Sequence, residues 1–415
     1  MNTQVSSSSQ TEKWKVVGLI ALAEFLAMSL WFSASAVTPV LIAEWQINAG
    51  QAAWLTMSVQ IGFVAGALTL TLLNIADLYA PRKVMAIGAI AGAVANALIA
   101  LFADGLLLAL PLRFATGFAL ASVYPVGMKI MATWMKKDRG LGIGLLVGAL
   151  TIGSASPHLL RAFGSITAWR PVMYGASGLA IIGGVIVWYV GRLGPYRSKT
   201  PPFNWRYMGS ALREKGLRLA NFGYLGHMWE LYAMWTWIPL FLAESFRASN
   251  GGILSAAQEQ QVALLAFAVI GIGGVGSFLA GIVADRWGRT RTTIVSMVVS
   301  GLCALSIGFF FGGSPTLVAL IALIWGFAIV ADSAQFSAAI SELSTPEYMG
   351  TALTMQTSLG FLLTMVSIRL IPILVDLIGW QWAFTILAIG PAFGIWAMQS
   401  LRQSPLAAKL ANGNG

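Results

Sequence analysis

The sequence predicts an all-α membrane protein in which twelve transmembrane helices form two pseudo-symmetric bundles of six. Composition is the first observation: 57% of the 415 residues are hydrophobic and only 10% are charged, whereas soluble domains carry roughly 25% charged residues. Mean hydropathy is +0.77, which is typical of membrane proteins. The other two observations are a series of long apolar runs and a repeat of residue patterns between the halves of the chain.

The apolar runs predict the helices, because a membrane-spanning helix needs about 20 apolar residues. The first run is longer than the core of a signal peptide, about 7–15 residues, so we expect it to be an uncleaved helix. In chain order the predicted helices are 16–43, 52–73, 84–103, 106–132, 141–160, 172–190, 219–242, 262–284, 292–311, 317–340, 351–377 and 382–398.

Basic residues predict the orientation. Most of the 25 Lys and Arg residues fall in segments that face the cytoplasm if the N-terminus is cytoplasmic, as the positive-inside rule requires. The net charge of +10 therefore reflects topology, and we expect no nucleic acid partner. We predict a multi-pass protein of the inner (cytoplasmic) membrane with both termini in the cytoplasm. The domains expected are a six-helix bundle at 1–190, a basic cytoplasmic linker at 191–218 and a second bundle at 219–415.

The two halves share residue patterns at a nearly constant spacing. Glu24 in "EFLAMSLW" and Glu230 in "ELYAMWTW" both begin the pattern Glu-x-x-Ala-Met-x-x-Trp, 206 positions apart. Asp77 in "NIADLYAPRK" and Asp285 in "GIVADRWGRTR" lie 208 positions apart. Each half holds an even number of predicted spans, so the repeats are related in parallel.

Composition also excludes several kinds of site. One cysteine, Cys303, and two histidines exclude a disulfide framework and argue against a metal site. We find no phosphate loop with its lysine, and expect the glycines of "GIGGVGSFLAG" to allow close helix packing. No cofactor or metal is expected, and active transport would depend on an ion gradient.

The segment "GIVADRWGRTR" resembles the loop signature of the major facilitator superfamily, G-x-x-x-D-R-x-G-R-[RK]. The matching residues are Gly281, Asp285, Arg286, Gly288 and Arg289. The corresponding first-half segment keeps Asp77 and Arg82 but has lost the rest. Arg113 and Gly117 in "RFATG" are similar to that family's helix-4 motif, while only Gly153 and Pro157 remain of its helix-5 antiporter signature.

The resemblance covers nearly the whole chain and implies a secondary transporter that alternates access between the two sides of the membrane. It implies that the two loop segments act as a conformational gate, with Asp285 bracing the cytoplasmic side. It also implies that the first, fourth, seventh and tenth helices surround a central cavity. Among the ionisable and aromatic residues of these helices, the candidates for the cavity are Glu24, Trp31, Arg113, His227, Glu230, Trp237 and Asp332.

A charged side chain inside a membrane costs a few kcal/mol, so these residues are candidates for proton coupling or solute binding. At 1.5 Å per residue, Glu24 lies roughly 12 Å and Glu230 roughly 17 Å from the cytoplasmic helix ends. We therefore expect two similar walls of one cavity, each with a carboxyl, a thioether and an indole. Either at least one of the glutamates carries a proton or binds a cation, Glu230 being the stronger candidate, or both only form hydrogen bonds with neighbouring helices.

The other candidates also have two interpretations. His227 lies one turn from Glu230 and either relays its proton or forms a local hydrogen bond. Arg113 either binds an anionic group or pairs with a carboxylate. Asp332 contacts the cavity or caps a helix end, and Trp237 lines a pocket or packs between helices.

We therefore predict a monomeric, proton-coupled secondary transporter whose partners are a small-molecule solute, protons and the lipid bilayer. A proton-driven efflux pump for lipophilic or cationic toxic compounds is the alternative within transport, and the direction of transport stays open. A membrane-embedded sensor or enzyme is the alternative from another class. It is disfavoured because no long soluble segment or set of catalytic ligands is present.

Overall fold

The computed structural model describes the chain except for residues 1–6, 136–138, 165–166, 197–212 and 346–348. The protein is 87% helical, without strands in the part described, which confirms the all-α prediction. Among the residues that the structure describes, nine helical segments are long and apolar enough to cross a membrane. The core of the predicted linker, 197–212, lies outside the described residues, so the linker stays a prediction.

The first half of the chain contains long helices close to the predicted runs, together with shorter pieces. The bounds are α1 (Ser7–Met28), α2 (Ser33–Ala36), α3 (Thr38–Trp45), α4 (Ala49–Leu72), α5 (Ile75–Leu78), α6 (Pro81–Phe102), α7 (Leu106–Leu120), α8 (Tyr124–Ala132), α9 (Arg139–Phe163) and α10 (Arg170–Val190).

The second half follows the same plan. Gly379, at φ 76°, interrupts the helical path near the end of α18, so the two last predicted runs remain separate. The bounds are α13 (Lys215–Ser249), α14 (Ala256–Trp287), α15 (Arg289–Ser306), η1 (Ile307–Phe310), α16 (Pro315–Ala331), α17 (Ser333–Leu343), α18 (Met349–Ala383), η2 (Phe384–Ala388), α19 (Ile389–Arg402), η3 (Pro405–Lys409) and η4 (Ala411–Gly413).

Three predicted helices are interrupted near their middle, and the expectation of continuous helices was wrong there. The run 16–43 divides into α1, α2 and α3, the run 106–132 into α7 and α8, and the run 317–340 into α16 and α17. Serine hydroxyls contribute to the first two breaks, because they compete for backbone carbonyls. Ser29 donates to the Leu26 carbonyl, Ser33 to that of Leu30 and Ser122 to that of Ala119.

Helices α1 and α13 are not among the nine segments that are long and apolar enough to cross a membrane, and their residues explain why. The apolar part of α1 stops at Met28, and α13 contains His227, Glu230 and three tryptophans that lower its hydropathy. The two helices that carry the repeated glutamate are therefore both outside this group of nine.

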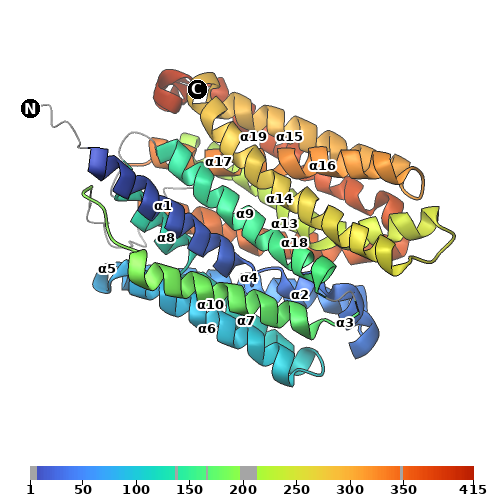
Figure 1. The fold of residues 1–415 in the computed structure, drawn as a ribbon. Coiled ribbons are helices and arrows are strands. Elements are labelled where there is room, and N and C mark those ends of the chain that lie inside the picture. The colour runs from blue at the N-terminus through green and yellow to red at the C-terminus, as the bar shows by residue number, and fades with distance from the viewer. Residues whose placement is uncertain (1–6, 136–138, 165–166, 197–212, 346–348) are drawn as a thin grey trace, which may run out of the picture.

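Helices pair in the same way in both halves. Before Val190 the principal pairs are α6–α10, α4–α7, α1–α10, α6–α7 and α1–α9. After Lys215 the equivalent pairs are α15–α19, α14–α16, α13–α19, α15–α16 and α13–α18. Helices α9 and α14 and helices α4 and α18 join the first half to the second. The described start of the chain and its C-terminus lie at the same end of the helices (Figure 1).

Glycines permit close contact where α9 meets α14. A Cβ atom on Gly274 would lie 2.9 Å from the carbonyl oxygen of Gly148, and one on Gly148 would lie 3.2 Å from that of Gly274. In α14, a Cβ on Gly276 would lie 2.3 Å from the Phe327 carbonyl oxygen. The glycines of this segment are packing positions, as expected from the sequence.

Candidate solute pathway

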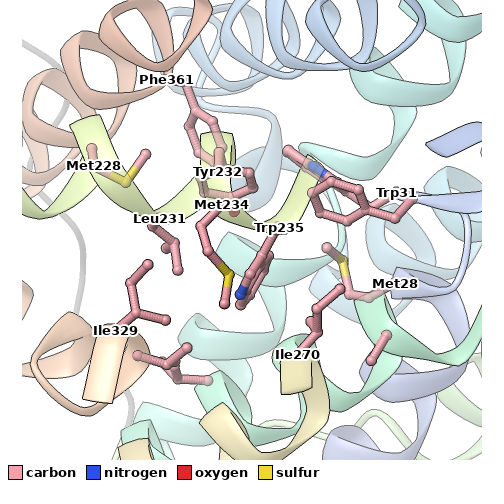
Figure 2. Packing of buried hydrophobic residues seen from close by; sticks show 14 of the residues in the cluster. Met28, Trp31, Met228, Leu231, Tyr232, Met234, Trp235, Ile270, Ile329 and Phe361 are labelled. Atoms are coloured by element: carbon pink, nitrogen blue, oxygen red, sulfur yellow. The ribbon is translucent and has the colours of Figure 1, made fainter. Parts of the chain in front are cut away.

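An aromatic cluster fills the centre of the molecule, between the two halves. Its members are Trp31, Phe32, Phe63, Tyr232, Trp235 and Phe361, all buried. Ring centroids are 5.0 Å apart for Trp31 and Phe63, 5.8 Å for Trp31 and Tyr232, and 5.0 Å for Tyr232 and Phe361. Figure 2 shows Trp31, Tyr232, Trp235 and Phe361 among methionine and isoleucine side chains. The centre is therefore packed at this level in the conformation described.

The two tryptophans predicted to line a pocket lie in different surroundings. Trp31 belongs to the aromatic cluster. Trp237 donates its indole N–H to the Ile368 carbonyl at 2.9 Å and contacts Trp380, between α13 and α18. The sequence analysis missed the other members of the cluster, because an aromatic residue in an apolar helix gives no signal of the direction it faces.

Glu24 lies in α1, close to the end of that helix, and is fully buried. Neither carboxyl oxygen has a hydrogen-bond partner among the described residues. A Cβ atom on Gly127 of α8 would lie 3.2 Å from Oε2, and the Met85 side chain lies beside the same glycine. A carboxyl group buried without a hydrogen-bond partner is far less costly as a neutral acid than as an anion.

Glu230, its repeat counterpart in α13, has a different environment. The indole N–H of Trp325 donates to Oε1 at 2.7 Å, and the Ser300 hydroxyl donates to Oε2 at 2.9 Å. Both donors come from the second half, from α16 and α15. Glu230 is therefore held by hydrogen bonds within its own half. The expected likeness of the two glutamates holds for their positions in the repeat and not for their partners.

Arg113 of α7 holds the interruption between α1 and α2 in place. Its guanidinium donates to the carbonyl of Leu30 at 3.0 Å and to that of Trp31, and its Nε donates to the Leu55 carbonyl at 3.1 Å. The Ser33 hydroxyl and the Asn96 side-chain oxygen accept further bonds. Broken helices leave carbonyls without their usual donors, and Arg113 supplies them. Its partners are neutral, whereas a carboxylate had been one expectation.

His227 contacts Asp332 at the interruption between α16 and α17. His227 Nδ1 lies 2.8 Å from Asp332 Oδ1, and Nε2 lies 3.2 Å from the Ser333 hydroxyl. Both side chains are buried, at 1% and 2% exposure. His227 therefore connects α13 to the break in the tenth predicted helix. Asp332, predicted to contact the cavity or cap a helix, pairs with a histidine at that break.

The second loop segment is organised around Arg289. Arg289 donates to both carboxylate oxygens of Glu342, at 2.6 and 2.8 Å, and to Gln335 at 2.8 Å. Asp285 is a third and more distant acceptor at 3.3 Å, and its side chain is 48% exposed. These partners all belong to the second half, so the side-chain contact of Asp285 holds α14 to α15 and not the two halves to each other.

Other gate residues have smaller roles in the contacts described. In the first half Asp77 pairs with Lys129 of α8 at 2.6 Å, while Arg82 is half-buried beside Gly191. Gly281 is buried, and Arg286 is exposed. Gly288 has φ 99°, a conformation that favours glycine. The sequence analysis assigned no role to Lys129, Gln335 or Glu342. Lys129 and Gln335 lie inside the predicted runs 106–132 and 317–340, and Glu342 follows the second of these runs.

We expect Glu342→Gln to reduce thermal stability more than Asp285→Asn, because Glu342 provides the bidentate, less exposed partner of Arg289. Thermal unfolding of the two purified variants measures the difference. Asp77→Asn, which removes a partly exposed pair, is the control in the other half. Equal unfolding temperatures for the Glu342 and Asp285 variants would contradict this assignment.

Interrupted central helices, buried ionisable groups at those interruptions and many membrane-crossing segments define a membrane transporter. The chain belongs to the Major Facilitator Superfamily, whose family model matches residues 20–367 and 220–413. The resemblance seen in the loop signature is confirmed. The protein is accordingly a multi-pass membrane transporter and not an enzyme.

Two relatives add detail. A probable sulfoacetate transporter, SauU, of Cupriavidus necator is 23% identical over 235 residues, which are 51% of this chain and 51% of the relative. The match thus spans about half the length of that protein. The crystal structure of the nucleoside transporter NupG is similar in fold, with a TM-score of 0.68, 15% identity and coverage of 93% of this chain and 99% of the other.

Proposed function

We propose that the protein is a secondary active transporter that moves a small solute by alternating access and is driven by protons. In this proposal twelve helices form two six-helix bundles, at 1–190 and 219–415, joined by the linker 191–218. The protein lies in the inner membrane with both termini in the cytoplasm. The repeated order of helix pairs supports the two bundles, and the basic residues of the loops support the orientation.

The buried Glu24 carboxyl is the observation that carries proton coupling. A buried carboxyl group without hydrogen-bond partners is favoured in its protonated form. If alternation opens a path from Glu24 to water, the same group can ionise and release its proton. Glu230 already has two donors that suit an anion. The preference between the two glutamates therefore moves from Glu230 to Glu24.

The aromatic cluster supports the alternating part of the proposal. Residues of α4 and α18 meet there with those of the broken first helix and α13, and the Thr364 hydroxyl of α18 donates to the Gln60 side chain of α4 at 2.9 Å. Separation of these helices would open the centre to one side of the membrane. The solute of the matched relative, sulfoacetate, is a small organic molecule, which supports a small solute here.

Transport in proteoliposomes tests the proposal. Sulfoacetate is the first solute of a screen that reads the internal pH with an entrapped dye. We expect a transported solute to change the internal pH, and we expect a protonophore to abolish its accumulation, because no gradient would remain to drive it. Accumulation against a solute gradient that is unchanged by the protonophore would contradict proton coupling.

A further inference from the structure

Helix α9 carries two basic side chains that the gate and coupling residues do not use. His158 is fully buried, and Arg161, one residue beyond the predicted helix 141–160, lies in the last turn of α9 and is 7% exposed. Residues three positions apart lie on one helix face, with Cβ atoms about 5–6 Å apart. Thr151 and Ser154, also buried, precede His158 on the same face.

The local sequence fixes the backbone here despite a proline. Pro157 has no N–H to donate to the Gly153 carbonyl, and the Ser156 hydroxyl donates to that carbonyl instead, at 2.7 Å. Gly153 allows α9 to approach α1 closely, since a Cβ atom there would lie 2.3 Å from the Phe25 carbonyl oxygen. The segment before His158 is thereby held rigidly against the first helix.

Both His158 and Arg161 have nitrogen atoms that make no hydrogen bond within the described residues. Neither ring nitrogen of His158 has a partner in the part of the chain described, nor does Nε of Arg161. Arg161 Nη1 donates to the Ala36 carbonyl of α2 at 3.2 Å. A buried donor that makes no hydrogen bond is costly, so these groups are suited to a ligand that accepts hydrogen bonds.

The acidic partner of Arg161 is distant and partly exposed. Glu259 of α14 lies 3.9 Å from Arg161 Nη2, and its side chain is 33% exposed. Arg247 of α13 adds positive charge near Arg161, although Arg247 itself pairs with Glu244. The neighbouring Gln260 is occupied by the Ala162 carbonyl at 2.9 Å. Arg161 therefore has one distant anionic partner on the opposite half and a free Nε–H.

We propose that His158 and Arg161 bind the carboxylate or sulfonate group of a small organic anion that this transporter carries. Arg161 supplies charge and a second N–H, and His158 supplies a donor one turn deeper on the same face. The site joins α9 to α14, which belong to different halves, so the anion competes with Glu259 for Arg161. This proposal names the solute class and rests on the proposed transport function.

Ligand-dependent thermal stability tests the site. Cys303 is the chain's one cysteine and is buried, so its labelling by a thiol-reactive fluorophore reports unfolding. Methanesulfonate and acetate are the anionic probes, and acetamide is the neutral probe, all at constant ionic strength. We expect both anions to raise the unfolding temperature, since a ligand of the folded state stabilises it, and we expect acetamide to have no effect.

Matched variants locate the effect. Arg161→Gln is expected to weaken probe affinity about ten-fold or more, as for the loss of a buried charged hydrogen bond, and His158→Gln to weaken it less. Arg161→Lys keeps the charge and is expected to retain part of the response. Arg247→Gln, which changes an arginine of the same region, is expected to respond like the unaltered protein.

Several outcomes would overturn the site. They are the absence of stabilisation by both anions, equal stabilisation by acetamide, and an unchanged response in Arg161→Gln. Binding is measured in detergent without a proton gradient. A failure here therefore leaves proton coupling untouched, while a failure of the protonophore experiment leaves the anion site standing.

Discussion

Glu24→Gln is expected to reduce concentrative transport by about ten-fold or more, while solute exchange across the membrane continues. Glutamine has nearly the shape of protonated glutamate but cannot release a proton. The variant should therefore fold, bind solute and alternate, yet remain uncoupled from the proton gradient. Uptake under an imposed proton gradient and counterflow without one, in the same proteoliposomes, measure the two activities. The pH dependence of solute binding should also flatten.

Glu230→Gln is the matched control, because it makes the same change at the repeat position. A glutamine there would direct an N–H₂ group at one of the two donors, Trp325 or Ser300, so we expect lower thermal stability by about 1–3 kcal/mol with coupling retained. If Glu24→Gln and Glu230→Gln both transport at the unaltered rate with the same pH dependence, neither glutamate carries the proton. The paired His227 and Asp332 would then be the place to look.

Arg113→Lys is expected to destabilise the protein by about 3 kcal/mol or more, the scale seen when a buried charged group loses its partners. The planar guanidinium reaches Leu30, Trp31 and Leu55 from one side chain, which a lysine ammonium cannot do. Thermal unfolding followed at Cys303 measures the loss. Arg402→Lys, at an exposed position, should be neutral. An unchanged unfolding temperature for Arg113→Lys would mean that the interrupted first helix does not depend on this residue.

Much of the fold could be predicted from the sequence because lipid imposes a simple rule. A spanning segment must be apolar over about 20 residues, and a duplicated chain shows the rule twice. The interruptions in the first, fourth and tenth helices could not be predicted in this way. Serines within the first two runs do not by themselves mark a break, because many helices contain serine, and the breaks also depend on partners far along the chain, such as Arg113 for the carbonyls of Leu30 and Trp31.

The sequence predicts which residue types belong to the candidate site, but it does not predict their hydrogen-bond partners. An ionisable residue in an apolar run marks a place of interest, and Glu24 and Glu230 were found on that basis. Nothing near Glu230 in the sequence indicates Trp325 or Ser300, which lie on other helices. His158 was overlooked because an isolated histidine in a helix usually has a satisfied partner, and only the three-dimensional structure leaves its nitrogens without one in the described residues.

The aromatic cluster also has an optical consequence. Indole emission shifts to longer wavelength as water reaches the ring, and Trp31 and Trp235 lie where the two halves meet, packed against Tyr232. In the proposed alternating cycle, a motion that separates the halves would bring water to these two indoles, whereas a tryptophan on the outer surface, such as Trp396, which is 53% exposed, would stay in the same surroundings. If the proposed cycle operates, the emission of Trp31 and Trp235 is expected to report the separation of the halves without an attached dye.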